Sequence, residues 1–235
     1  MNQPKIHALI PAAGRGTRYG GDRLKQYLPI GGKAVMSYAI NAFQFHPLIA
    51  SVTVVLADDD QWFESAVGSL SSVVDTVIGG DTRAHSVRNG LKQIISKNPV
   101  SDWVLVHDAA RPCLAPACLD RLLEEGLKSP DGAILAMPLG DTLKQAGDDG
   151  EIIGTVDRSG LWTAQTPQFF PIEKLLSAIE SAHVHGHEMT DEASAMELAG
   201  FKPKLVMSSA ANIKITHPSD LAIAEAWLLR KGQTA

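Results

Sequence analysis

Residues 6–18 read Ile6-His7-Ala8-Leu9-Ile10-Pro11-Ala12-Ala13-Gly14-Arg15-Gly16-Thr17-Arg18, a short apolar run that continues into a glycine-rich turn. The run Ile6–Ala12 has the near-continuous apolar character of a strand that a parallel sheet buries on both faces. Similar runs rich in Val, Ile and Leu follow at Val52–Ala57, Val73–Ile78, Trp103–His107 and Ala133–Met137. We therefore predict a mostly parallel sheet.

Helical segments separate these predicted strands. Apolar residues recur at helical spacing in Met36–Phe45, Trp62–Leu70, Ala84–Ile95 and Pro116–Gly126. An alternation of strands and helices indicates a doubly wound α/β domain, in which ligands bind beyond the carboxyl ends of the strands. The residues directly after the strands are therefore the first candidates for function.

The chain at about residues 140–165 interrupts this alternation. A turn, Gly147-Asp148-Asp149-Gly150, joins two extended pieces, Thr142–Gln145 and Glu151–Thr155, and predicts a projecting hairpin. A two-stranded hairpin is only marginally stable alone in water, so we expect this arm to pack on a partner subunit.

The chain beyond the arm completes one domain that spans residues 1–235. The patterns predict helices at Glu173–His185, Asp191–Leu198 and Ser219–Arg230, and strands at Lys204–Met207 and Asn212–Thr216. We expect Ser219 or Asp220 to cap the last helix.

The composition limits the classes of partner. The formal net charge is −5, from 21 Lys and Arg against 26 Asp and Glu, so the protein has no general attraction for nucleic acid or anionic membranes. Any anion must therefore be bound by a local cluster of cations. The polar N-terminus and the lack of a run of about 20 apolar residues favour a cytoplasmic protein. Two cysteines, Cys113 and Cys118, are expected to stay reduced.

The turn after the first predicted strand has the features of a phosphate site. Gly14 and Gly16 allow close approach of backbone N–H groups to an anion, and Arg18 and Lys25 add positive charge. A dinucleotide fingerprint would need glycine at position 19, which is Tyr19, and the Gly-Lys-Ser/Thr of a Walker loop is absent. An ordinary connection between strand and helix remains the structural alternative.

A second glycine turn, Gly79-Gly80-Asp81-Thr82-Arg83-Ala84-His85-Ser86-Val87, follows the third predicted strand. In a purely structural interpretation, Gly80 ends the strand and Asp81 or Thr82 caps the next helix. In a functional one, the turn presents backbone groups and Asp81 to the polar edge of a base.

The fourth predicted strand leads into Val106-His107-Asp108-Ala109-Ala110-Arg111-Pro112. Asp108 at the end of a strand is suited to Mg²⁺, which takes one or two carboxylates and fills its other positions with phosphate oxygens and water. A structural salt bridge to Arg111 is the alternative, and the location favours the metal. We expect His107 to face packing rather than to act as a base.

Six motifs in register carry a resemblance over nearly the whole chain. They are Pro-Ala-Ala-Gly-x-Gly-x-Arg, Lys-Gln-Tyr, Gly-Gly-x-x-Arg-x-x-Ser-Val, Val-His-Asp-Ala-Ala-Arg-Pro, Thr-Pro-Gln-x-Phe and Asn-Ile-Lys-x-Thr. Together they closely resemble the 2-C-methyl-D-erythritol 4-phosphate cytidylyltransferases. The resemblance implies a Rossmann-like nucleotidyltransferase fold, Mg²⁺ as cofactor, and transfer of CMP from CTP to methylerythritol phosphate in the non-mevalonate route to isoprenoid precursors.

The resemblance also implies roles for individual residues. Arg18 and Lys25 would stabilise the transition state at the α-phosphorus, Arg158 and Lys214 would hold the acceptor phosphate, and Asp108 would contact Mg²⁺. The residues implied to bind the nucleotide and substrate are Pro11, Ala12, Ala13, Gly14, Gly16, Gly80, Asp81, Ser86, Asp108, Ala109, Arg111, Thr142 and Thr166.

In the family the arm interlocks two subunits of a homodimer, so the resemblance implies that Thr142 and Arg158 act in trans. The family commonly has an acidic residue just before Asn-Ile-Lys, where this chain has Ala211, which leaves open a second carboxylate near Lys214. Three rival functions remain: a ribitol 5-phosphate cytidylyltransferase, a sugar-nucleotide pyrophosphorylase that uses another base, and a non-catalytic nucleotide sensor.

Overall fold

A computed structural model describes residues 4–14 and 24–232, and within these ranges the centre of the protein is a seven-stranded sheet of order β11-β7-β10-β6-β1-β4-β5. Its strands are β1 (Ile6–Pro11), β4 (Ile49–Leu56), β5 (Asp75–Ile78), β6 (Trp103–Val106), β7 (Ala133–Pro138), β10 (Trp162–Pro171) and β11 (Lys204–Met207). Strand β10 pairs antiparallel with β6 and β7, and the other neighbouring pairs are parallel. The prediction of a mostly parallel α/β sheet is therefore confirmed.

The order of the strands fixes where a ligand can bind. The chain leaves β1 for β4 and β5 on one side, and then returns to place β6 on the other side of β1. Loops from the carboxyl ends of β1 and β6 therefore diverge, and such a switch point is the usual ligand crevice of doubly wound sheets. The glycine turn after β1 and Asp108 after β6 both lie at this edge.

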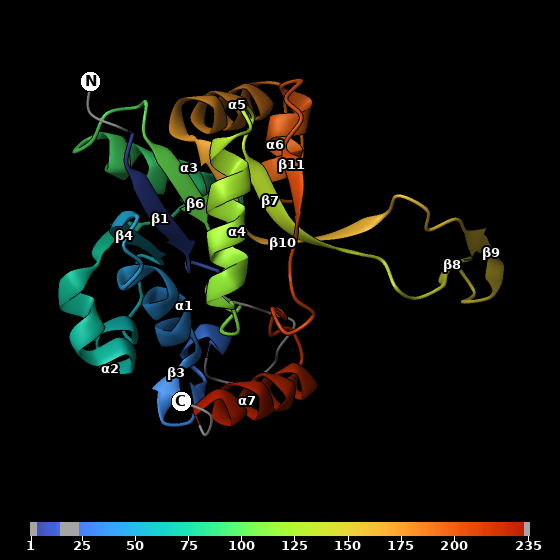
Figure 1. The fold of residues 1–235 in the computed structure, drawn as a ribbon, viewed down its shortest axis with the longest axis horizontal. Helices are drawn as coiled ribbons and strands as arrows, with labels where there is room; N and C mark the ends of the chain where they lie inside the picture. Colours follow the sequence, from blue (N-terminus) through green and yellow to red (C-terminus); the bar gives the residue numbers. More distant parts are fainter. Residues whose placement is uncertain (1–3, 15–23, 233–235) are drawn as a thin grey trace.

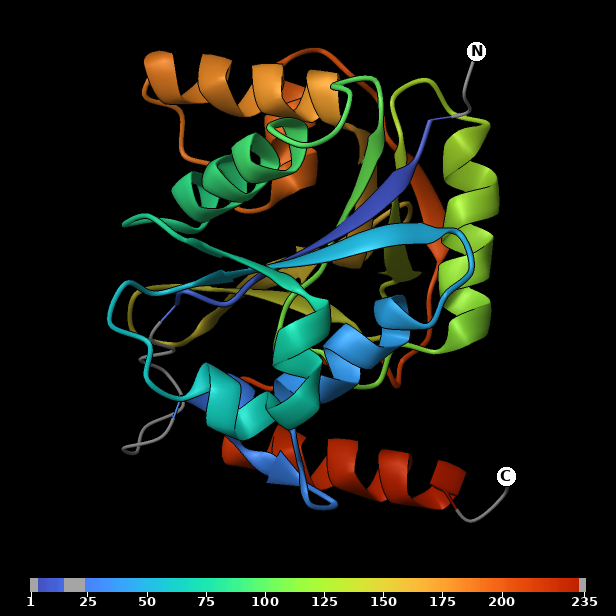
Figure 2. The ribbon, with the colours of Figure 1, turned by 90° about the vertical axis from the view of Figure 1, so that its left-hand side faces the viewer.

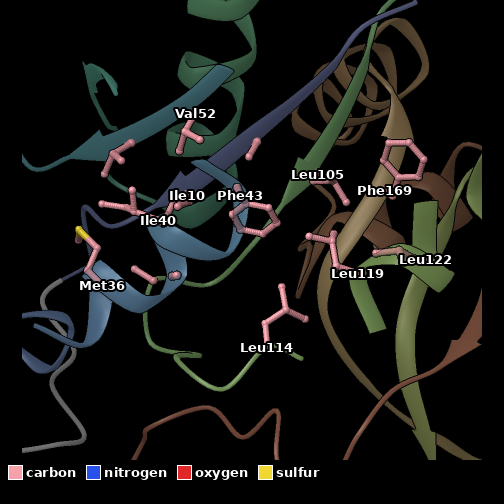
Figure 3. Close-up of a cluster of buried hydrophobic side chains, with 14 of the residues drawn as sticks. Ile10, Met36, Ile40, Phe43, Val52, Leu105, Leu114, Leu119, Leu122 and Phe169 are labelled. Carbon is pink, nitrogen blue, oxygen red and sulfur yellow. The ribbon is translucent and has the colours of Figure 1, made fainter. Parts of the chain in front are cut away.

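Helices cover both faces of the sheet (Figure 2). The helices are α1 (Val35–Gln44), α2 (Phe63–Val67), α3 (Arg83–Ile95), α4 (Pro116–Leu127), α5 (Ile172–Val184), α6 (Glu192–Leu198) and α7 (Pro218–Gly232). On one face Ile10 and Leu105 pack with Phe43 of α1 and Leu119 of α4 (Figure 3). On the other face, α3, α5 and α6 bury a second cluster around Leu9. Successive strand residues thus serve opposite faces, as the side-chain alternation of a strand requires.

Two predicted elements need correction. The predicted helix Trp62–Leu70 ends at Val67, because Gly68 takes a positive φ of 59°, and a 3₁₀ helix, η2 (Gly68–Val73), follows and delays the start of β5 to Asp75. The predicted strand Asn212–Thr216 does not form. Its backbone bonds to loops instead, with Ile215 N–H donating to the carbonyl of Ala110 at 2.9 Å.

Strand β10 is the main element that the apolar pattern did not predict. Its outer half mixes polar and apolar residues without a continuous apolar run, but Phe169 and Phe170 in its inner half are completely buried, and the strand pairs with both β6 and β7. The strand thereby connects the arm directly to the centre of the sheet.

The predicted arm is present as the antiparallel strands β8 (Leu143–Ala146) and β9 (Ile152–Val156). It extends away from the body of the molecule (Figure 1), and its apolar side chains Ile152 and Ile153 are 68% and 66% exposed. Exposed apolar side chains on a two-stranded hairpin are a feature of surfaces that a partner covers.

Helix α7 closes the lower end of the molecule in Figure 1, against the short hairpin of β2 (Pro29–Ile30) and β3 (Lys33–Ala34). The helix starts at Pro218, one residue before the predicted cap, so Ser219 and Asp220 lie inside its first turn. The Asp220 carboxylate nevertheless accepts hydrogen bonds from the N–H groups of Thr216 and His217 and so holds the helix start. Both cysteines are buried, and neither takes part in a disulfide among the described residues. Among the described helices, none has the length and apolar character needed to cross a membrane.

Candidate active site

A cavity of about 800 Å³ lies at the switch point of the sheet. Its walls come from the segments that follow β1, β4, β5 and β6, and from the loop before α7. The predicted site residues along it are Pro11, Ala12, Ala13, Gly14, Lys25, Gly80, Asp81, Ser86, Asp108, Ala109 and Lys214. A volume in this range is typical of a pocket for a small molecule or nucleotide.

The first wall is the glycine turn after β1, which Gln26 holds in place. The Gln26 side chain is 3% exposed, and its Nε2 donates to the carbonyl of Ala12 at 3.0 Å and to that of Gly14 at 3.5 Å. The 3₁₀ helix η1 (Lys25–Tyr27) thereby fixes the turn and places Lys25 along the cavity. The predicted residues Gly16 and Arg18 lie outside the described residues.

The second wall is the turn between β5 and α3. A Cβ atom on Gly79 would lie 2.6 Å from the Ala13 Cβ and 2.7 Å from the Ser86 Oγ, so the two glycine turns approach each other closely only because position 79 has no side chain. Thr82 caps α3 by accepting from the N–H of His85. Ser86 Oγ accepts from the N–H of Gly80 at 3.1 Å and so stabilises the turn as well as lining the cavity.

Asp108 forms the base of the cavity with cations around it. Its Oδ1 lies 3.1 Å from Arg83 Nη2, and its Oδ2 lies 2.9 Å from Lys214 Nζ and 3.5 Å from Arg111 Nε. Burial by itself would raise the pKa of Asp108, but these positive charges outweigh it and hold the pKa well below its usual range. The salt bridge to Arg111 considered from the sequence is therefore real, and it coexists with a position in the cavity.

His107 is part of a buried hydrogen-bonded chain that engages both of its ring nitrogens. His107 Nε2 lies 3.1 Å from the carbonyl of Arg111, which can only accept, so Nε2 carries the proton and donates. Nδ1 of the neutral ring then accepts from the hydroxyl of Thr166 at 3.0 Å, and Thr166 Oγ1 accepts in turn from the N–H of Asp108, also at 3.0 Å. Burial lowers the pKa of His107 to about 4, so the ring is neutral near pH 7. The expectation that it faces packing is confirmed.

Lys214 reaches the cavity on a loop that other parts of the chain hold firmly. Arg111 Nη1 donates to the carbonyl of Asn212 at 2.7 Å, and Asn212 Nδ2 donates to the carbonyl of Thr166 at 2.8 Å. Asn212 is completely buried, and its Nδ2 also donates to Gln165 Oε1 at 2.9 Å. Arg111 and Thr166 therefore shape the site from behind and are absent from the described residues that line the cavity.

Thr142 and Arg158 do not join the cavity within the described chain. Both are exposed residues of the arm, at its two connections to the body. The arm points away from the cavity-bearing body in Figure 1. A single subunit thus does not bring these two predicted residues to the others.

Sequence patterns did not reveal the roles of Gln26, Arg83, Asn212 and Glu192. The first three stand inside the motifs that carry the family resemblance, and this position in a motif was the one feature of the sequence that pointed to them. Arg83 Nη1 donates to Oε1 of Glu192, which is 3% exposed, and burial raises the pKa of this glutamate against the opposing charge of Arg83. Glu192 is in the first turn of α6, where an acid is ordinary.

His183 lies in the last turn of α5, and His185 and His187 follow the end of this helix; all three are exposed. His183 Nδ1 lies 3.3 Å from His85 Nε2, while His185 donates from Nδ1 to the carbonyl of Ser181. In the part of the chain that the structure describes, no group of three or more His, Cys, Asp or Glu side chains could hold a metal ion.

Comparisons with known proteins cover nearly the whole chain. The family model for 2-C-methyl-D-erythritol 4-phosphate cytidylyltransferase matches residues 6–230. Proteins of that name from Xanthomonas oryzae pv. oryzae (strain PXO99A) and Haemophilus influenzae (strain PittGG) are 49% and 45% identical, and the matches cover 97% and 96% of this chain and 84% and 97% of theirs.

Solved structures agree with the sequence comparisons. A crystal structure of a 4-diphosphocytidyl-2C-methyl-D-erythritol synthase superposes with a TM-score of 0.85 at 40% identity and covers 97% of this chain and all of its own. The Francisella tularensis 2-C-methyl-D-erythritol 4-phosphate cytidylyltransferase superposes with a TM-score of 0.81 at 32% identity, over 95% of this chain and 99% of its own.

Proposed function

Since the chain belongs to the 2-C-methyl-D-erythritol 4-phosphate cytidylyltransferase family, we propose how its cavity carries out that reaction. The enzyme transfers CMP from CTP to 2-C-methyl-D-erythritol 4-phosphate in isoprenoid biosynthesis. An oxygen of the acceptor phosphate attacks the α-phosphorus of CTP, the bond from that phosphorus to the bridging oxygen breaks, and pyrophosphate leaves.

The observation that carries the proposal is the meeting of two glycine turns and two lysines from distant parts of the chain in one cavity. The turns at Gly14 and Gly80 supply backbone groups, and Lys25 and Lys214 supply charge. The attacking group is already an anion, so the reaction needs charge neutralisation and alignment more than a general base. His107 cannot compete for the role of base, since its ring is buried, neutral and hydrogen-bonded on both sides.

We assign the two lysines to opposite sides of the reacting centre. Lys25, beside the turn after β1, stabilises the charge that develops at the α-phosphorus, together with Arg18. Lys214 binds the acceptor phosphate and orients it for in-line attack. The base of CTP lies against the turn of Gly80 and Asp81, next to Ala12 and Ala13, which line the same cavity.

Asp108 offers Mg²⁺ one carboxylate ligand at the base of the cavity. Asp108 is ionised, and it is a single carboxylate already shared among Arg83, Arg111 and Lys214. One carboxylate is enough for an ion that takes its other ligands from phosphate oxygens and water. When bound, Mg²⁺ would neutralise charge on the triphosphate, and Asp108 is the side chain that would hold it.

We propose that the arm completes the site in a homodimer. Arg158 and Thr142 are exposed at the two ends of the arm, which extends away from the body in Figure 1, and neither lines the cavity of its own subunit. Ile152 and Ile153 of the arm leave apolar surface uncovered. Covering that surface with a second copy buries the apolar side chains and brings Arg158 to the partner's acceptor site. The arm is thus both an interface and a source of a catalytic cation.

The test is a pyrophosphate-release assay that crosses CTP, UTP, ATP and GTP with methylerythritol phosphate and ribitol 5-phosphate in the presence of Mg²⁺. The proposal predicts release with CTP and methylerythritol phosphate, at least about 100-fold faster than with any other pair. Preference for ribitol phosphate or for another nucleotide would support one of the rival transferases. No release with any pair would favour a nucleotide sensor.

A further inference from the structure

Arg83 bridges two carboxylates that come from different elements. It is the first residue of α3 and lines the cavity, where its Nη2 lies 3.1 Å from Oδ1 of Asp108. Its Nη1 donates to Oε1 of Glu192, at the start of α6. The Glu192 side chain is 3% exposed and is absent from the described lining of the cavity, and its hydrogen bond to Arg83 connects it to that lining.

The position of Glu192 is itself fixed, because side chains around it hold the first turn of α6 in place. Asp191 and Ser194 form a reciprocal capping box at the start of α6. Gln168 of β10 donates from Nε2 to Oδ2 of Asp191 at 2.8 Å and accepts from the N–H of Ala193, also at 2.8 Å. The first turn of α6 is therefore tied to a central strand, and Glu192 provides a rigid point of attachment for the guanidinium.

The two oxygens of Asp108 have different partners. Oδ1 faces Arg83, while Oδ2 faces Lys214 at 2.9 Å and Arg111 at 3.5 Å. A guanidinium is planar and presents its N–H groups in fixed directions, so a guanidinium anchored on one side restricts the carboxylate on the other. Without that anchor, Arg83 can turn toward Asp108 alone and change the direction in which Oδ2 points.

We propose that Glu192 is a positioning residue, which acts through Arg83 to hold the Asp108 carboxylate where it orients Lys214 toward the acceptor phosphate. This inference rests on the proposed function, because it assigns the acceptor phosphate to Lys214. It goes beyond that function because it states that a buried residue outside the cavity affects how the acceptor phosphate binds. The hydrogen bonds that hold the two glycine turns come from Gln26 and Ser86 and do not involve Glu192, so we expect the nucleotide half to change much less.

The test is the variant Glu192→Gln, which keeps the shape of the side chain and removes its charge. Steady-state assays give KM for the acceptor, and calorimetry gives Kd for CTP. We expect the acceptor KM to rise about tenfold and the Kd for CTP to stay within about threefold. Glu180→Gln is the matched control, since Glu180 pairs with Lys92 on the surface at 2.9 Å, and we expect it to change neither quantity.

A double-mutant cycle with Arg83→Gln separates positioning from a structural contribution. If Glu192 acts through Arg83, adding Glu192→Gln to Arg83→Gln causes no further rise in the acceptor KM. Arg83→Gln alone leaves the buried Glu192 carboxylate without its partner, whereas the double variant buries two neutral amides. The double variant therefore also provides a measurement of the acceptor KM if Glu192→Gln alone does not fold.

Two results would overturn the inference. One is an unchanged acceptor KM in Glu192→Gln, with kcat falling only as far as the folded fraction measured by thermal melting. The other is a loss of CTP affinity as large as the effect on the acceptor, which would place Arg83 on the nucleotide. Failure of the wild-type enzyme to turn over CTP and methylerythritol phosphate would contradict the proposed function instead.

Discussion

Lys214 Nζ lies 2.9 Å from Oδ2 of Asp108, although one residue precedes the last helix and the other follows the sixth strand. In the proposed mechanism this pair joins the triphosphate side of the cavity to the acceptor side. The Lys214 side chain is 37% exposed and that of Asp108 only 11%, so the ammonium can turn to an incoming phosphate while the carboxylate stays in place. The geometry makes Lys214 well placed to bind a second anion.

Replacing Lys214 with Ala removes the charged donor that we assign to the acceptor phosphate. We expect kcat/KM for methylerythritol phosphate to fall about 100-fold, since a hydrogen bond to a charged group contributes about 1.5–3 kcal/mol. Steady-state kinetics at saturating CTP measure this kcat/KM. Lys204→Ala, which removes a surface lysine paired with Glu125, is the control and should keep wild-type kinetics. Equal losses in both variants would contradict a specific role for Lys214.

The pKa of His107 predicts a pH dependence of stability. The pKa is lowered to about 4 by burial, so between about pH 6.5 and 4 the unfolded state binds a proton that the folded state does not. The stabilising contribution of the neutral His107 ring is fully present above about pH 6.5 and is lost as pH falls toward 4. We expect this loss to reduce the free energy of unfolding by about 2 kcal/mol between about pH 7.5 and 5.

Urea denaturation of the wild type and of His107→Gln across this pH range isolates the contribution of His107. The wild type should lose more stability than the variant on acidification. Parallel curves for the two proteins would show that His107 titrates normally in the folded state.

Mixing two inactive variants tests whether the arm acts in trans. Lys25→Ala damages the cavity of its own subunit, and Arg158→Ala damages the arm that it gives to its partner. In a two-fold dimer, each mixed dimer contains one intact site, so subunit exchange should restore about a quarter of wild-type activity. If the arm serves its own subunit, every site keeps one defect and mixing restores nothing.

Deleting Thr142–Thr155 is the companion experiment. The arm carries the exposed Ile152 and Ile153, so its loss should abolish dimerisation, measured by analytical ultracentrifugation, together with turnover. A fully active monomer would refute the trans site.

Much of the fold followed from the sequence because buried parallel strands have a strong local signal. The runs around Leu9 and Leu105 are apolar on both faces of the sheet and could be located directly. Strand β10 escaped because its first residues mix polar and apolar side chains without a continuous apolar run, and only its second half, with Phe169 and Phe170, enters the core. The prediction of a strand at Asn212–Thr216 was wrong. Its β-branched residues are typical of a strand, but its backbone forms hydrogen bonds with loops and not with a neighbouring strand.

The residues of the candidate site could be located where a motif marks them. Asp108 follows β6, and Lys25 and Lys214 stand in two further motifs; all three line the cavity. The supporting residues could not be assigned in the same way. Glu192 lies at a helix start with no local sign that Arg83 is its partner, since the two meet only through the packing of α6 against the rest of the domain.

The most direct test of the proposed mechanism compares turnover with CTP binding in Lys25→Ala. The Lys25 ammonium is assigned to charge that develops only in the transition state, so kcat should fall at least about 100-fold while the Kd for CTP changes less than about threefold. Lys33→Ala, at an exposed position in the neighbouring hairpin, should leave both quantities unchanged. Equal losses of turnover and affinity in Lys25→Ala would contradict the mechanism, because they would make Lys25 a ground-state contact.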